Sequence, residues 1–269
     1  MSSNLPIGIF DSGVGGLSVL HHVRALLPRE SLVYVADRGH IPYGNKSNDY
    51  ITQRATLIAD FLLQQPVKAI VVACNTATAA AVHTLRERYP IPIIGMEPGV
   101  KPAIAQSRTG LIGILATEGT LGSGKFKYLL ERHANGADIF IKPCNGWVEE
   151  IERGRQDSAE TARMVRETLE PLLAKGVDTL VLGCTHYPFL RRTIEQAAGD
   201  DIAIIDTGHA VATHLRRRLH QEGLLNDSSE SAGETFWCSG PLEEMRTLVQ
   251  RLWGRPCPIH ALPDQANRS

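Results

Sequence analysis

The sequence predicts an α/β fold with two similar lobes and largely parallel sheets. Three observations lead to this prediction. Short apolar runs alternate along the chain with segments of helical periodicity. Two of the apolar runs end in the same way, with a small residue, a cysteine and hydrogen-bonding residues. The chain has 269 residues, enough for one large domain or two smaller lobes, and two crossovers favour two lobes.

The candidate strands are rich in Val, Ile and Leu, and most lack alternation of polar and apolar residues. This pattern is typical of strands that are buried on both faces of a parallel sheet. The candidate strands span residues 7–10, 32–36, 69–73, 91–95, 111–116, 139–142, 179–183, 202–206 and 235–238. Between them lie segments whose apolar residues recur at helical spacing. These candidate helices span residues 17–27, 50–64, 76–89, 121–133, 158–175 and 189–198.

Two crossovers define the predicted lobes. Residues 96–102 contain two prolines and a glycine after a candidate strand, and a second crossing point falls at residues 206–209. The chain between these points is a self-contained run of strand–helix units, and the tail after them contains two further helices. The first lobe is therefore predicted to comprise residues 1–97 plus 209–269, and the second lobe residues 98–208.

Composition excludes several classes of protein. The net charge of -1 gives no general attraction to nucleic acid or to an anionic membrane, so neither partner is expected. No apolar stretch approaches the roughly 18 residues of a membrane helix. The first residues lack the pattern of a secretory signal, and five cysteines are too few and too sparse for a disulfide framework. Reduced thiols in the cytoplasm are therefore expected.

A glycine-rich turn follows the first candidate strand. Residues 8–17 have the sequence Gly-Ile-Phe-Asp-Ser-Gly-Val-Gly-Gly-Leu, which lets the backbone turn tightly and direct N–H groups at an anion. A nucleotide site is the obvious rival, but the full spacing of a dinucleotide fingerprint and the ending of a phosphate loop are both missing. Asp11 would also repel a phosphate, so a carboxylate or amine ligand is favoured. A turn with only a folding role is the alternative.

Two cysteines stand at matching places in the chain. Residues 69–76 and 179–186 each consist of an apolar strand, a small residue, a cysteine and then polar residues at an expected helix start. A helix N-terminus lowers the pKa of a thiol and favours the thiolate, so both Cys74 and Cys184 are candidates for catalysis. His186 can act as a proton partner of Cys184.

This pairing favours a two-base reaction. Inverting a stereocentre by proton transfer needs a base on one face of Cα and an acid on the other. A thiol pKa of about 8.5 lies close enough to neutrality for either form to be reached by modest tuning. A structural cysteine, a single-thiol hydrolase that uses Cys184 with His186, and half of a metal site are the alternatives. No second ligand pair with zinc-like spacing occurs in the sequence, and no metal is expected.

These residues closely resemble the glutamate racemase family, within the aspartate/glutamate racemase superfamily. The matching pieces occur in the order of the family and cover about three-quarters of the chain. They are residues 10–17, 36–37 with 42–44, 73–77, Thr117 with Thr120 and Ser123, and 183–188. Each piece alone is weak, whereas the ordered set is highly specific. The family fold has two similar α/β lobes that face each other across the site.

The resemblance implies roles for individual residues. It implies that Cys74 and Cys184 transfer the proton, with Asp11 as the acidic neighbour of the first thiol and His186 as the partner of the second. Glu152 matches a family glutamate near that histidine. The positions implied to bind the substrate are Asp11, Ser12, Tyr43, Gly44, Asn75, Thr76, Thr185 and His186.

Two of these assignments have plain alternatives. Tyr43 and Gly44 are also compatible with a simple proline-containing turn, and Glu152 with one more acid on an exposed helix. The family often has proline after the cysteine that corresponds to Cys144, whereas this chain has Asn145, which loosens the alignment near Glu152.

The implied function is cofactor-independent interconversion of L- and D-glutamate, which supplies D-glutamate for peptidoglycan synthesis and so for cell-wall biogenesis and cell shape. A racemase of aspartate or of a hydantoin is the alternative with the same chemistry, and a noncatalytic amino-acid-binding module is the alternative of another class. Neither a pyridoxal cofactor nor a metal is implied. A homodimer is left open. Only ten residues precede Asp11, too few for the N-terminal extension of family members that need a cell-wall precursor, so basal activity without one is expected.

Overall fold

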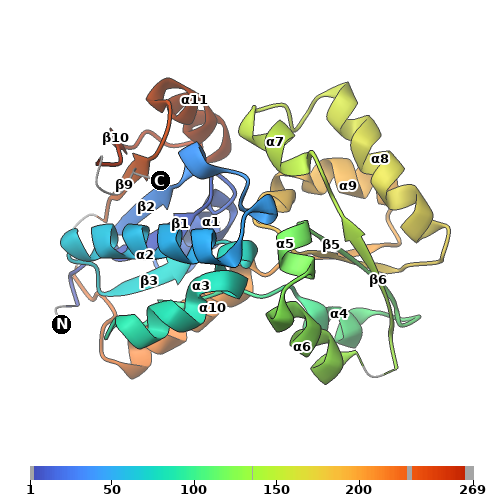
Figure 1. Ribbon diagram of the computed structural model, residues 1–269, viewed down its shortest axis with the longest axis horizontal. Coiled ribbons are helices and arrows are strands. Elements are labelled where there is room, and N and C mark those ends of the chain that lie inside the picture. The colour runs from blue at the N-terminus through green and yellow to red at the C-terminus, as the bar shows by residue number, and fades with distance from the viewer. Residues whose placement is uncertain (1–2, 135, 229–231, 264–269) are drawn as a thin grey trace.

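The structure, a computed structural model, describes residues 3–134, 136–228 and 232–263. Within these residues the strands form two sheets, one of six strands and one of four, and every pair of neighbouring strands runs parallel. Figure 1 shows each sheet with its own helices, side by side along the long axis of the molecule. The predicted α/β fold with two lobes is confirmed.

The six-stranded sheet forms the centre of the first lobe. Its strands are, in spatial order, β10 (Ile259–Ala261), β9 (Glu234–Cys238), β2 (Leu32–Ala36), β1 (Ile7–Asp11), β3 (Ala69–Val72) and β4 (Ile93–Ile94). β1 lies between β2 and β3, and all its residues are buried, which explains the apolar run that precedes Asp11. The carboxyl end of β1 therefore lies near the middle of the sheet, at the edge formed by the carboxyl ends of the strands, where ligands bind in folds of this class.

Helices cover both faces of this sheet. Side chains of a strand alternate between faces, so Ile9 packs on one side and Phe10 on the other. The face of Ile9 is covered by α1 (Leu17–Leu26), α10 (Gly208–Gln221) and α11 (Leu242–Leu252). The face of Phe10 is covered by α2 (Asn48–Gln64) and α3 (Asn75–Arg88). Two short 3₁₀ turns, η1 (Arg38–His40) and η2 (Tyr43–Asn45), connect β2 to α2.

The four-stranded sheet forms the centre of the second lobe. Its strands are, in spatial order, β6 (Asp138–Pro143), β5 (Leu111–Ala116), β7 (Thr179–Leu182) and β8 (Ala203–Ile205). One face packs against α4 (Val100–Gln106) and α6 (Gly124–His133), and the other against α7 (Trp147–Glu152), α8 (Ala159–Leu173) and α9 (Arg191–Ala198). The short helix α5 (Glu118–Leu121) follows β5. The lobe boundaries at residues 97/98 and 208/209 stay a prediction.

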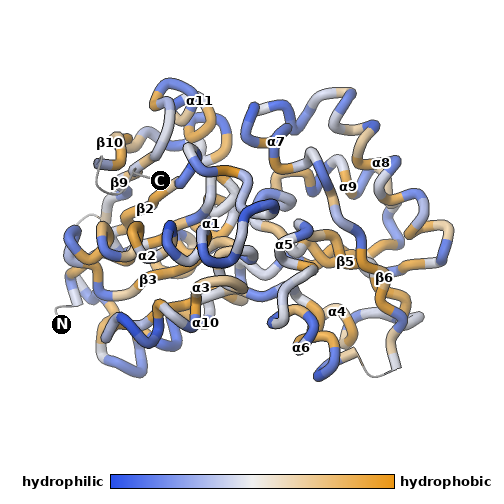
Figure 2. The backbone as a smooth tube through the Cα atoms, in the orientation of Figure 1, coloured by the Kyte–Doolittle hydropathy of each residue, from blue (hydrophilic) through white to orange (hydrophobic). Residues whose placement is uncertain are grey.

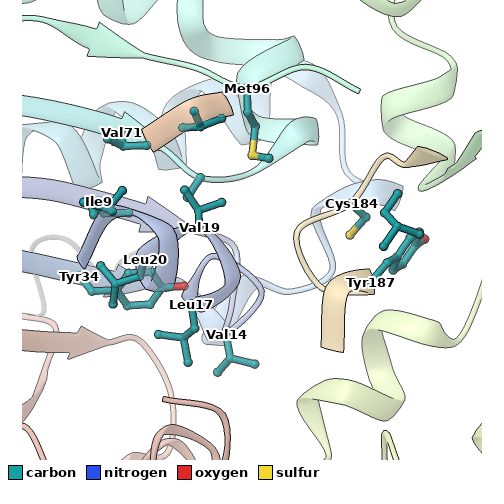
Figure 3. Packing of buried hydrophobic residues seen from close by; sticks show 14 of the residues in the cluster. Ile9, Val14, Leu17, Val19, Leu20, Tyr34, Val71, Met96, Cys184 and Tyr187 are labelled. Carbon is teal, nitrogen blue, oxygen red and sulfur yellow. The ribbon is translucent and has the colours of Figure 1, made fainter. Parts of the chain in front are cut away.

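One buried apolar cluster extends through both lobes. It includes Ile9, Leu20 and Val71 of the first lobe together with Cys184 and Tyr187 of the second. Figure 3 shows these residues, with Cys184 and Tyr187 on the segment opposite the β1–α1 turn. Figure 2 shows the corresponding pattern along the chain, with apolar strands inside and polar helix surfaces outside. Burial of apolar surface across the lobe boundary stabilises their contact.

Several predicted elements differ from the observed ones. The predicted helix at residues 121–133 is divided into α5 and α6 around Gly122, and the predicted helix at 189–198 begins as a 3₁₀ turn, η3 (Tyr187–Leu190). The two helices and the strand expected in the tail are present as α10, α11 and β9. β10, α4 and α7 were not predicted.

Candidate active site

The glycine-rich turn after β1 surrounds the carboxylate of Asp11. This residue is fully buried at the end of β1, and one carboxylate oxygen accepts a hydrogen bond from the backbone N–H of Gly16 at 2.8 Å. The hydroxyl of Ser12 donates to the other oxygen at 3.4 Å. Burial raises the pKa of Asp11 above its ordinary value, although the nearby charge of His186 and these hydrogen bonds oppose the shift.

Cys74 caps the N-terminus of α3. Its Sγ accepts a hydrogen bond from the backbone N–H of Ala77 at 3.4 Å and lies 3.9 Å from the hydroxyl of Ser12. We expected the helix terminus to favour the thiolate, and this expectation is wrong. Burial, and then the charge of Asp11, raise the pKa of Cys74 well above its ordinary value and outweigh the N–H of Ala77.

Cys184 lies in a turn rather than at the start of an α-helix. β7 ends at Leu182, and the chain makes one 3₁₀ turn before α9 begins at Arg191. The expected equivalence of the two cysteine segments therefore holds for the strands but not for the helices. The Sγ of Cys184 lies 3.8 Å from Nδ1 of His186, close enough for a proton to pass between them.

His186 is held by the carboxylate of Glu152. Nε2 of His186 lies 2.8 Å from Oε1 of Glu152, and both side chains are buried. Glu152 is the last residue of α7, so the alternative of an acid on an exposed helix is wrong. Burial alone would lower the pKa of His186, but hydrogen bonds to Cys184 and Glu152 raise it well above its ordinary value. The imidazolium is therefore the favoured form beside Cys184.

The site is assembled from both lobes at very close range. A Cβ atom on Gly13 would lie 2.0 Å from Oε1 of Glu152, and a Cβ atom on Gly15 would lie 2.3 Å from Nδ1 of His186. The turn of the first lobe therefore needs glycine at both positions so that the His–Glu pair of the second lobe can approach. The backbone N–H of Val14 donates to Glu152 at 2.6 Å and fixes this approach.

A small cavity between the lobes is lined by both thiols. Its lining comprises Ser12, Pro42, Tyr43, Gly44, Cys74, Asn75, Thr76, Thr117, Val148, Cys184, Thr185 and His186. Both polar atoms of the Asn75 side chain and the hydroxyl of Thr185 are buried and have no hydrogen-bond partner among the described residues. Buried polar groups are normally paired, so these atoms are suited to a polar ligand.

Two further predicted binding positions have their side chains engaged by the protein. The hydroxyl of Tyr43 donates to Asp37 at 2.5 Å, and Asp37 is also bound by Arg54, so this ring borders the cavity while its hydroxyl faces away from a ligand. The hydroxyl of Thr76 contacts those of Thr117 and Thr120 at 2.9 and 3.1 Å. This threonine cluster joins α3 of the first lobe to α5 of the second.

Most of the site residues that the sequence analysis named line the cavity, whereas Asp11 and Glu152 do not line it and lie beside Cys74 and His186. Their roles in binding and catalysis stay predictions. The structure also adds Arg38, Pro42 and Val148, which the sequence analysis did not single out. Pro42 and Val148 line the cavity, and Arg38 forms an ion pair with Glu152 at 2.7 Å. No sequence motif marked Arg38, because the contact joins η1 to a helix 114 residues further along the chain.

The described residues contain neither a cluster suited to a metal ion nor a helix that could span a membrane. In residues 3–134, 136–228 and 232–263, no group of three or more His, Cys, Asp or Glu side chains is arranged to hold a metal ion. No helix in the part of the chain that the structure describes is both long enough and apolar enough to span a membrane.

Comparison with known proteins gives consistent matches over most of the chain. A family described as Asp/Glu/Hydantoin racemase matches residues 16–215. The glutamate racemase of Methylococcus capsulatus is 54% identical over 258 residues, which cover 96% of this chain and 95% of the relative. The glutamate racemase isoform RacE1 of Bacillus anthracis superposes with a TM-score of 0.89 at 33% identity, covering 97% of this chain and 98% of that one.

The Escherichia coli glutamate racemase, solved in complex with L-glutamate and the activator UDP-MurNAc-Ala, superposes with a TM-score of 0.87 at 32% identity. The alignment covers 96% of this chain and 98% of that one.

Proposed function

Because this chain belongs to the Asp/Glu/Hydantoin racemase family, we propose that it is a glutamate racemase that moves the α-proton between Cys74 and Cys184. One observation carries the proposal: two buried thiols, one from each lobe, line the same small cavity. Each thiol has its own proton partner, Asp11 for Cys74 and His186 for Cys184. This arrangement supplies an acid and a base on opposite sides of one bound molecule.

The unpaired polar atoms suit an amino-acid substrate. The amide of Asn75 and the hydroxyl of Thr185 provide hydrogen-bond donors, and they come from opposite lobes. A carboxylate bound by them would be held on both sides, which fixes Cα between the thiols. Removal of the α-proton leaves an electron pair that spreads into this carboxylate, so donors at its oxygens stabilise the transition state.

In one turnover, one proton is removed from Cα and one proton is returned to it. The Cys74 thiolate takes the α-proton of D-glutamate, and the electron pair of the C–H bond remains on Cα and its carboxylate. The Cys184 thiol then gives its proton to the opposite face of Cα and becomes a thiolate beside the His186 imidazolium. The L enantiomer reacts by the same steps in reverse. The carboxylate of Asp11 lies beside Cys74 and is the proposed acceptor of the Cys74 proton in the starting state.

Glutamate is proposed as the substrate because the relatives and solved structures named above are glutamate racemases. The wider role follows from the product: we propose that the enzyme supplies D-glutamate for peptidoglycan synthesis in the cytoplasm. A homodimer stays a prediction.

Circular dichroism tests this proposal directly. Purified wild-type protein should remove the signal of L-glutamate and of D-glutamate without added pyridoxal phosphate, nucleotide or metal, and Cys74→Ser should leave both signals unchanged. L-Aspartate serves as the comparison substrate. Faster loss of the aspartate signal would contradict the glutamate assignment, and no loss with either amino acid would contradict the racemase assignment.

A further inference from the structure

Arg38 reaches from the first lobe to the carboxylate that holds His186. It lies in η1, immediately after β2, and its side chain is only 8% exposed. Nε of Arg38 donates to Oε2 of Glu152 at 2.7 Å, and a terminal nitrogen donates to the backbone carbonyl of Glu152 at 3.2 Å. The guanidinium group therefore forms hydrogen bonds to both the side chain and the backbone of Glu152, the last residue of α7.

The two carboxylate oxygens of Glu152 bind different partners. Oε1 faces Nε2 of His186 and the backbone N–H of Val14, whereas Oε2 faces Arg38. Without Arg38, Oε2 would be a buried anionic oxygen that has lost its charged donor, which is costly. The carboxylate would then rotate or take up a proton. Either change would remove the fixed acceptor that orients the ring of His186 beside Cys184.

We propose that Arg38 is a positioning residue for one half of the reaction, acting on Cys184 through Glu152 and His186. This inference rests on the proposed function and deepens it. The hydrogen bonds of Arg38 go to Glu152 and Glu244, whereas the thiol of Cys74 is bonded to Ser12 and Ala77. Arg38 therefore acts most directly on the Cys184 side of the cavity, whereas its link to the Cys74 side passes through the backbone N–H of Val14 on Glu152.

Steady-state racemisation cannot show this asymmetry. The two enantiomers have equal free energies, so kcat/KM must be equal in the two directions for every variant. An irreversible partial reaction is needed. A glutamate analogue with chloride on the β-carbon supplies it: one thiolate takes the α-proton, the C–H electron pair becomes a Cα–Cβ double bond, and chloride leaves. No second thiol has to return a proton.

The experiment measures chloride release from both enantiomers of this analogue by wild type, Arg38→Met and Arg38→Lys. The Cys184→Ser variant first identifies the enantiomer that Cys184 deprotonates. For that enantiomer, Arg38→Met should be slower by about 10- to 100-fold, which corresponds to loss of a hydrogen bond to a charged group. For the other enantiomer, its rate should stay within about 2-fold of wild type. Arg38→Lys keeps the positive charge but lacks the planar set of donors, so its elimination rate should lie between those of wild type and Arg38→Met.

The matched control is Glu244→Gln. Glu244 accepts a hydrogen bond from Arg38 at 3.2 Å but is itself largely exposed, so both elimination rates should stay near those of wild type. Equal losses for the two enantiomers in Arg38→Met would show a general structural role and overturn the inference, as would unchanged rates for both. A wild-type enzyme that eliminates chloride from neither enantiomer would refute the proposed function itself.

Discussion

At the scale of single residues, the two thiols have different surroundings although they are proposed to do the same chemistry. Cys74 lies beside a carboxylate and a hydroxyl, whereas Cys184 lies beside an imidazole that is bound to a carboxylate. The negative charge of Asp11 opposes a thiolate at Cys74, whereas the neighbour of Cys184 is the imidazole of His186, whose pKa is raised well above its ordinary value. The two halves of the proposed reaction therefore depend on neighbours of different chemistry.

The division of labour between the thiols leads to a first prediction. Cys74→Ser and Cys184→Ser should each lower racemisation by several orders of magnitude, because a serine hydroxyl is a poor base at neutral pH. Each variant should still eliminate chloride from one enantiomer of the β-chloro analogue. By family resemblance, Cys74→Ser should keep activity toward the L analogue and Cys184→Ser toward the D analogue. If both variants preferred the same enantiomer, the thiols could not lie on opposite faces of Cα.

The buried carboxylate of Asp11 leads to a second prediction, about stability. Its folded-state pKa lies above its ordinary value of 3.8, so its contribution to stability is full at lower pH and is lost as pH rises through the folded-state pKa. Asp11→Asn is neutral at every pH and keeps a similar shape. Its free energy of unfolding, measured by urea denaturation, should therefore gain on that of wild type as pH rises above 3.8. The Asp11→Asn variant should also racemise glutamate more slowly than wild type. A difference in stability that does not change with pH would contradict the raised pKa.

At the scale of elements, the β1–α1 turn leads to a third prediction. Gly15→Ala is compatible with the backbone, but its Cβ would lie 2.3 Å from Nδ1 of His186, so the imidazole must move away from Cys184. We expect a fall in kcat of about 10- to 100-fold with the fold retained. Gly124→Ala is the matched control, because a Cβ there meets no atom within 4 Å and alanine favours the helix. Equal activity of the two variants would show that the turn does not constrain the His–Glu pair.

The central strands β1, β2, β3, β5 and β7 were predicted well because nearly all of their residues are buried. β2 and β5 have the predicted bounds, and the others differ by two residues or fewer at either end. The elements that escaped prediction are short and gain their stability from neighbours. β10 is a three-residue strand at the sheet edge, and α7 is a six-residue helix that starts after Gly146, whose φ is +84°. Neither is long enough to show a periodic pattern.

The candidate site was predicted in part for a related reason. Cys74 and Cys184 follow buried strands directly, so the strand ends alone place them at sheet edges. Glu152 was assigned only by resemblance, because its burial depends on how α7 packs against the other lobe. Arg38 was not predicted at all, since its role depends on a contact between distant parts of the chain. The sequence correctly predicted that Cys74 lies at the start of a helix. The expected lowering of its pKa is wrong, because the effect of burial outweighs that of the helix terminus.

At the scale of the whole molecule, the site exists only where the two lobes meet. The first lobe supplies Asn75 and the second supplies Thr185, and neither side chain has a hydrogen-bond partner among the described residues. The lobes are joined near the cavity by the threonine cluster and by the hydroxyl of Ser18, which donates to the carbonyl of Thr185 at 2.8 Å. A substrate that satisfies both unpaired groups therefore adds a further connection between lobes that already touch.

This leads to the last prediction, which hydrogen-exchange mass spectrometry can test. A saturating mixture of D- and L-glutamate, already at equilibrium, should slow exchange at the β1–α1 turn, at the start of α3 and at the turn after β7, because bound ligand stabilises the state that binds it. Helix α8 lies on the outer side of the second lobe and should exchange at the same rate with and without ligand (Figure 1). Asn75→Ala should weaken the protection in both lobes together, since one ligand joins them. Protection confined to one lobe would mean that glutamate binds to that lobe alone, and the two thiols could not then flank its Cα.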